Sequence, residues 1–133
     1  MAISSVIKSI QDIMRKDAGV DGDAQRISQL GWMIFLKVFD DSEKELELMN
    51  DDYESPIPDE YRWRNWAEDE EGITGDELLS FIDEMFDSLK DMELDDQSSE
   101  RAFVVRDVFE DSYNYMKSGT LLRQVLNKLN EVN

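Results

Sequence analysis

The segment of residues 61–66, YRWRNW, contains the residue types in this chain that are best suited to binding a nucleic acid. Its aromatic rings can stack on bases, and the interleaved Arg62 and Arg64 can pair with phosphates. The same residues can instead be structural, with the tryptophans anchoring a loop to the core and the arginines pairing with nearby acids. The pattern favours this structural role and leaves nucleic-acid binding as the alternative. The acids in question are Asp59, Glu60 and Glu68.

A second set of basic residues lies near the N-terminus, within residues 3–16, where apolar residues recur at helical spacing. Arg15 and Lys16 fall in the last turn of this predicted helix, where cations interact favourably with the helix dipole. That structural role accounts for them, and phosphate binding is again the alternative. If the chain contacts DNA, we expect the contacts to come from Arg62, Arg64, Lys8, Arg15 and Lys16.

Catalytic chemistry finds little support in the sequence. The chain has no cysteine and no histidine, which excludes thiol nucleophiles, disulfides, histidine bases and zinc sites. Residues 17–23, DAGVDGD, resemble a calcium loop, but the closing glutamate is missing because Ser28 holds its position. The acids of the helix predicted after Thr74 form a solvated face rather than a catalytic pair. We therefore expect no catalytic residue, cofactor-binding residue or metal ligand in this chain.

The formal net charge of the 133 residues is −18, from 32 acidic and 14 basic residues. Such a charge repels DNA at long range, so a DNA contact requires a local basic patch or a partner that carries the positive charge. It also suits a basic protein partner. Residues 1–11 have neither the basic start nor the apolar block of a signal peptide, so we expect a cytoplasmic protein.

The spacing of apolar residues predicts an all-α fold of about five helices packed around a buried central helix, residues 23–50. The predicted core face of this helix comprises Ile27, Leu30, Gly31, Ile34, Phe35 and Val38. Because residues 30–39 are apolar almost all round, we expect other helices on every side of this stretch. The stretch is only about 15 Å long, too short to cross a membrane.

Proline and capping residues predict where the other elements begin and end. Pro56 and Pro58 forbid a helix and predict an irregular excursion with two tryptophans over residues 53–73, in which a short hairpin is one option. A further helix is expected to run through Tyr113 and Met116 and to stop at residues 118–119. The predicted N-caps are Asp23, Thr74 in a capping box with Glu77, Ser98 or Ser99, and Thr120.

The order of three blocks in the chain indicates a family. LGWMIFLKVFDDSEKELE is followed by IPDEYRWRNW, and then by VRDVFEDSYNYMKSGTLLRQVLNKLNEV. Together they resemble the N-terminal helical domain of type I restriction-modification DNA methyltransferase (M) subunits. The resemblance covers essentially the whole chain, residues 1–133. It implies a single-domain fragment, with a catalytic methyltransferase domain expected downstream.

In such subunits the downstream domain binds S-adenosylmethionine and methylates adenine at N6. Its Gly-rich cofactor loop and its Asn/Asp-Pro-Pro-Tyr/Phe motif do not occur in this sequence. The resemblance therefore implies a non-catalytic domain that helps the complex assemble and close around double-stranded DNA. The implied partners are the other M subunit, the specificity subunit and the restriction subunit. The alternative is a free-standing acidic helical interaction protein, or a DNA mimic that binds a basic protein.

Overall fold

The computed structural model describes residues 3–132, and over this range it contains α-helices and one 3₁₀ helix but no strand. The all-α prediction is confirmed. Nowhere between residues 3 and 132 is a helix long and apolar enough to span a bilayer. The elements are α1 (Ile3–Arg15), α2 (Gly22–Met49), η1 (Asp59–Tyr61), α3 (Trp63–Trp66), α4 (Gly75–Lys90), α5 (Glu100–Glu110) and α6 (Gly119–Leu129).

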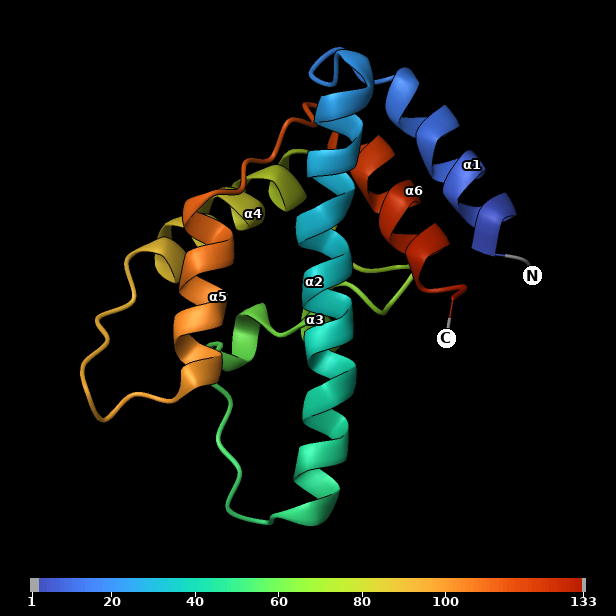
Figure 1. Ribbon diagram of the computed structural model, residues 1–133. Helices are drawn as coiled ribbons and strands as arrows, with labels where there is room; N and C mark the ends of the chain where they lie inside the picture. Colours follow the sequence, from blue (N-terminus) through green and yellow to red (C-terminus); the bar gives the residue numbers. More distant parts are fainter. Residues whose placement is uncertain (1–2, 133) are drawn as a thin grey trace.

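The long helix α2 runs the height of the molecule, with α1 and α6 on one side and α4 and α5 on the other (Figure 1). Helix α1 packs against α6, and α4 packs against both α5 and α6. Large aromatic rings connect α2 to α4 and α5. Trp32 meets Phe86 edge-on with 5.0 Å between ring centroids, and Phe86 meets Phe109 in the same way at 4.9 Å.

The buried face of α2 differs from the predicted one. Trp32, Met33 and Leu36 are buried, whereas Ile27, Ile34 and Val38 are 69%, 37% and 58% exposed. Helical spacing could not separate these two faces, because residues 30–39 carry apolar side chains on both. Helix α2 is therefore central in the core, but one of its apolar faces is open to solvent.

The irregular excursion contains the short helices η1 and α3 and no hairpin, because Trp63 and Trp66 turn into the core within one helical turn. A second difference follows α5, which ends at Glu110 rather than continuing to residue 118. The buried amide of Gln29 binds the next segment, which is not helical. It accepts from the Tyr115 backbone N–H at 2.7 Å and donates to Asn114 Oδ1 at 2.8 Å.

The observed helix caps agree only in part with the predicted ones. Ser99 caps α5 as predicted, since its Oγ accepts from the Ala102 backbone N–H at 3.1 Å. Helix α6 is capped by Ser118 rather than Thr120. Thr74 does precede α4, but its hydroxyl donates to the Gly119 carbonyl at 3.5 Å instead of capping. Helix α2 begins at Gly22, one residue before the predicted Asp23 cap.

The start of α6 touches the start of α4 so closely that Gly119 tolerates no side chain. A Cβ there would lie 1.8 Å from the Gly75 carbonyl oxygen. Gly119→Ala is therefore expected to lower the free energy of unfolding by about 1–3 kcal/mol, measured by urea unfolding. Gly31→Ala is the matched control, because its Cβ would meet nothing within 4 Å. It should stabilise the helix by about 0.5–1 kcal/mol, and a similar loss at both glycines would contradict the prediction.

Candidate functional site

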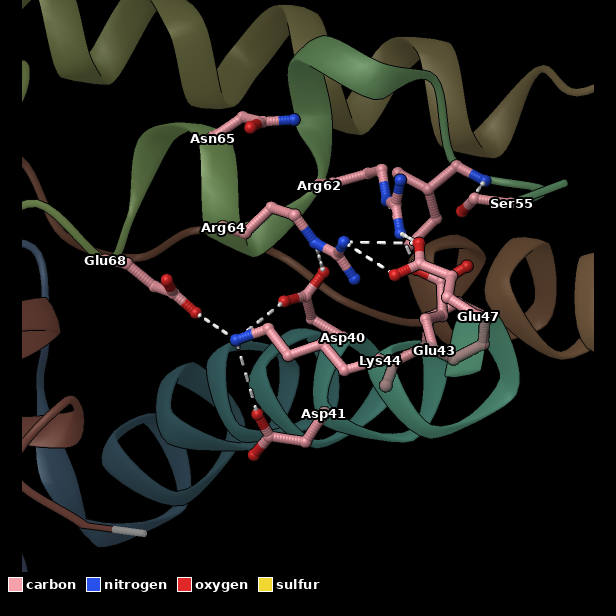
Figure 2. A network of polar contacts seen from close by, with 12 residues as sticks. Asp40, Asp41, Glu43, Lys44, Glu47, Ser55, Arg62, Arg64, Asn65 and Glu68 are labelled. Carbon is pink, nitrogen blue, oxygen red and sulfur yellow. Dashed lines mark hydrogen bonds and ion pairs between the residues drawn. The ribbon is translucent and has the colours of Figure 1, made fainter. Parts of the chain in front are cut away.

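Arg62 and Arg64, predicted as DNA contacts, both point at α2, where a row of carboxylates meets them (Figure 2). Arg64 Nε donates to Asp40 Oδ1 at 2.9 Å, and Arg64 Nη1 donates to Glu47 Oε2 at 2.8 Å. Arg62 donates to the same Glu47 and lies 3.5 Å from Glu43 Oε1, measured from its Nε. The two arginines thus attach the segment around α3 to the C-terminal half of α2.

Two of these carboxylates are buried, so their partners must compensate for the loss of contact with water. Asp40 and Glu43 are 1% and 0% exposed. A carboxylate that is taken out of water needs a counter-charge and hydrogen bonds to remain ionised. Glu43 gains a further hydrogen bond from the Tyr53 hydroxyl at 2.7 Å, in addition to its pairing with Arg62.

The network continues along α2 in both directions from Glu43. Lys44 Nζ pairs with Glu68 Oε1 at 2.8 Å, which joins α2 to the residues after α3. The Arg101 guanidinium lies over the Phe39 ring, 4.3 Å from its centroid, and Nη2 donates to Ser42 Oγ at 2.6 Å. Cationic side chains from two other segments, residues 62–64 and α5, therefore meet one face of α2, which adds its own Lys44.

The charges of the network shift the ionisation of its members. Hydrogen bonds from Arg62 and then Arg64 lower the pKa of Glu47 below its ordinary value of 4.5. The hydrogen bond to Glu68 raises the pKa of Lys44, although partial burial opposes it. Burial, followed by the bond to Glu43, raises the pKa of Tyr53. Each shift stabilises the charge state that the contacts require.

Replacing Glu47 by glutamine is expected to change how acid affects stability. The pKa of Glu47 is depressed in the folded chain, so its contribution is fully present above about pH 4.5 and is lost as the pH falls through the folded-state value. The free energies of unfolding of wild type and Glu47→Gln should therefore converge as the pH is lowered. Urea unfolding at a series of pH values measures this. Glu45→Gln, an exposed position on the same helix, is the control. Parallel curves for wild type and Glu47→Gln would contradict the assignment.

The structure realises the structural role of Arg62 and Arg64, but with different partners from those expected. Of the acids near them in sequence, Asp59 lies 3.7 Å from Arg62, while Glu68 pairs with Lys44. The main partners belong to α2, at positions 40, 43 and 47, one helical turn apart. The spacing of these three acids along one face of α2 is the signal in the sequence that could have marked them. Nothing in the sequence indicated that Arg62 and Arg64 would be the residues that pair with them. DNA contact by the two arginines stays a prediction.

The N-terminal candidates lie elsewhere. Lys8 and Arg15 are exposed on α1, and Lys16 is exposed directly after it. Arg15 pairs with Asp12 at 3.0 Å, and both side chains are more than half exposed, so this pair is weak. Lys8 and Arg15 lie on α1 and Lys16 follows its last residue, and α1 packs against α6. These three cations are therefore separate from the network on α2.

Sequence reasoning missed Arg123, a buried cation at 5% exposure on α6. Its guanidinium donates to the backbone carbonyls of Trp66 at 2.8 Å, Ile73 at 2.9 Å, Asp69 at 3.0 Å and Ala67 at 3.1 Å. Burial lowers its pKa, an effect that the nearby Asp69 carboxylate opposes. Arg123 thus holds the loop that follows α3 in place.

The segment that resembles a calcium loop also has a structural role. Asp17 is 4% exposed, and its Oδ1 accepts from the backbone N–H groups of Gly19 at 2.7 Å and Lys117 at 2.9 Å. Its Oδ2 accepts from the Ser118 N–H at 2.9 Å. The carboxylate therefore joins the α1–α2 loop to the start of α6. No group of three potential metal ligands occurs within the part of the chain that the structure describes.

Comparison with known proteins gives concordant matches. A family model described as the HsdM N-terminal domain matches residues 3–129. The type I restriction enzyme EcoEI methylase subunit of Escherichia coli is 63% identical over 133 residues, which is 99% of this chain and 27% of that protein.

Two solved structures have the same fold. One, from Vibrio vulnificus YJ016, is assigned as the modification subunit of a type I restriction enzyme. It has a TM-score of 0.85 and 37% identity over 98% of this chain and 30% of that one. The other comes from work on complex assembly and conformational transition in the type I R-M system. It has a TM-score of 0.84 and 28% identity over 98% of this chain and 26% of that one. The chain spans less than a third of each relative.

Proposed function

The chain belongs to the HsdM N-terminal domain family, and on this basis we propose that it is the non-catalytic domain of a type I DNA methyltransferase subunit. In this proposal it helps the subunits assemble and close around DNA. Methylation of adenine at N6 and binding of S-adenosylmethionine belong to the rest of the full-length subunit. The observation that carries the proposal is the family match over residues 3–129.

The proposed location is the cytoplasm. The proposed partners are the other M subunit, the specificity subunit, the restriction subunit and double-stranded DNA. The names of the relatives support this, since they describe subunits of type I enzymes. A free-standing DNA mimic is not favoured, because the chain aligns over 99% of its length with part of a methylase subunit.

Calorimetric titration with S-adenosylmethionine tests whether the cofactor site lies outside residues 1–133. We expect the full-length subunit to bind the cofactor and the chain of residues 1–133 to show no binding at the same concentrations. Binding by the isolated chain with comparable affinity would overturn the proposal, because the cofactor site would then lie within the helical domain.

We propose that this domain contacts DNA phosphates chiefly through Lys8, Arg15 and Lys16, which are exposed. Arg62 and Arg64 remain candidates of second rank, because their side chains are only 12% and 23% exposed and are engaged by acids of α2. Phosphate contacts position the duplex and carry no sequence information.

Replacing Lys8, Arg15 and Lys16 together by alanine should weaken DNA binding of the assembled complex and flatten its salt dependence. The slope of log K against log salt should fall by up to about 0.9 for each phosphate that the variant no longer binds. An unchanged slope would remove these residues from the interface. Alanine at Arg62 or Arg64 is a poorer test, because it removes the guanidinium beside buried Glu43 or the hydrogen-bonded cation of buried Asp40 and is expected to destabilise the fold.

A further inference from the structure

One face of α2 carries a row of apolar residues that residues 3–132 leave largely open to solvent. We call Ile27, Gly31, Ile34 and Val38 the α2 seam. The three large side chains are 69%, 37% and 58% exposed, and a Cβ added to Gly31 would meet no atom within 4 Å. The positions follow one another after four, three and four residues, the spacing by which one helix packs along another.

The seam continues onto a neighbouring element. A groove of about 160 Å³ lies beside its C-terminal half and is lined by Ile34 and Val38 together with Leu129 and Val132. The apolar surface therefore extends from α2 to the end of α6, with Lys37 and Asp41 at its border. Single exposed apolar side chains are ordinary, but an aligned run beside an apolar groove is typical of a protein interface.

Gly31 indicates what kind of structure fits. A glycine inside a helix costs backbone entropy, and here it relieves no contact within the domain. At the middle of the seam it would let a second backbone approach closely, because the distance between packed helices depends on the side chains at their contact. The occupant that this surface fits is therefore an α-helix.

The charges around the seam indicate what kind of helix it is. Asp23, Asp41 and Glu45 are exposed on α2 near the seam, and Lys37 is already paired with Asp41 at 3.6 Å. A second copy of this chain would bring the same acids and another net charge of −18. Like charges facing each other across an interface oppose association, whereas lysine or arginine beside an apolar stripe would favour it.

We infer that the α2 seam is the docking surface for an amphipathic helix of another subunit, with basic residues beside its apolar stripe. The inference rests on the proposed role in complex assembly and names the surface and partner chemistry for it. It also accounts for the difference between the predicted and the observed core face of α2: the exposed face is apolar because it packs against a different polypeptide.

Carbene footprinting with mass spectrometry tests which polypeptide covers the α2 seam, because the reagent labels exposed aliphatic side chains. The samples are the isolated chain, the full-length subunit alone and the assembled complex. We expect labelling of Ile34 and Val38 to be the same in the first two samples and to fall several-fold in the complex. Val104, which is 48% exposed on α5, is the internal reference.

The other outcomes overturn the inference. Protection in the full-length subunit alone would mean that the rest of the same polypeptide covers the seam. Concentration-dependent protection of the isolated chain would mean that a second copy does. An assembled complex with the seam fully labelled would overturn the inference and leave the proposed function intact, whereas a full-length subunit that joins no partner subunit would overturn both.

The double variant Ile34→Lys/Val38→Lys provides an independent test, because it places cations against the apolar stripe and the basic residues of the partner. Ile34 and Val38 are 37% and 58% exposed, and a lysine at either position can keep its ammonium group in water, so the far-UV circular dichroism of the isolated chain should be preserved. Association of the full-length variant with its partner subunits should weaken by about tenfold or more. Val104→Lys is the control, and equal association of the two variants would overturn the inference.

Discussion

Replacing Arg123 by methionine is expected to lower the free energy of unfolding by about 3–5 kcal/mol. Methionine fills much of the same volume but donates no hydrogen bond. The substitution would leave the carbonyls of Trp66, Ala67, Asp69 and Ile73 without their shared donor. The carbonyls of Ala67 and Asp69 keep a second donor, Asn130 Nδ2 at 2.7 Å and the Gly72 N–H at 2.9 Å. The cost therefore falls mainly on the Trp66 and Ile73 carbonyls, at about 1–3 kcal/mol each, reduced where water reaches the group.

Urea unfolding followed by circular dichroism measures the loss of stability, and two variants frame it. Arg123→Lys keeps the charge but not the planar fork of donors, so its loss should be intermediate. Lys128→Met removes a cation from the same helix whose partner, Glu131, is an exposed neighbour at 3.3 Å. That change should cost about 0.5 kcal/mol or less. Equal losses at residues 123 and 128 would show that the carbonyl contacts contribute little.

Trp32→Ala is expected to cost about 3–5 kcal/mol, because it opens a cavity where α2 meets α4 and α5. The Trp32 side chain is 1% exposed and packs edge-on against Phe86, with Phe109 beside it at 6.4 Å between ring centroids. Empty space would replace the indole ring, since the surrounding helices cannot fully collapse around alanine.

Phe35→Ala and Trp32→Phe are the comparisons for this prediction. Phe35 lies on the predicted core face but is only half-buried, so its removal should cost clearly less. The Trp32 indole N–H makes no hydrogen bond with the described residues, so phenylalanine reduces the volume without breaking a hydrogen bond. Equal destabilisation by Trp32→Ala and Phe35→Ala would mean that the predicted core face is the true one.

Features that depend on neighbouring residues could be predicted from the sequence. Apolar periodicity indicated the all-α class, Pro56 and Pro58 excluded a helix between α2 and η1, and Ser99 marked the start of α5. These signals act over a few residues, because helix propensity, proline geometry and capping are local. The order of the blocks along the chain also sufficed to indicate the family that the match over residues 3–129 confirms.

Of the candidate site, the sequence supplied the residues but not their partners. The aromatic and arginine pattern of residues 61–66 singled out Arg62 and Arg64 and favoured a pairing with acids, which the structure shows. It could not identify Asp40 and Glu47, because an acidic helix offers many equivalent carboxylates and only packing selects among them. The DNA contacts remain predictions that binding measurements on the assembled complex will decide.

Which polar groups meet in the interior depended on the tertiary structure alone. Arg64 binds Asp40 from 24 residues away, Arg123 binds the Trp66 carbonyl across 57, and Gln29 holds Tyr115 across 86. No local pattern encodes such pairs, since each depends on the arrangement of whole helices. The same holds for α2, whose two apolar faces are alike in sequence. Packing by α4 and α5 buried the face of Trp32 and left the α2 seam open to solvent.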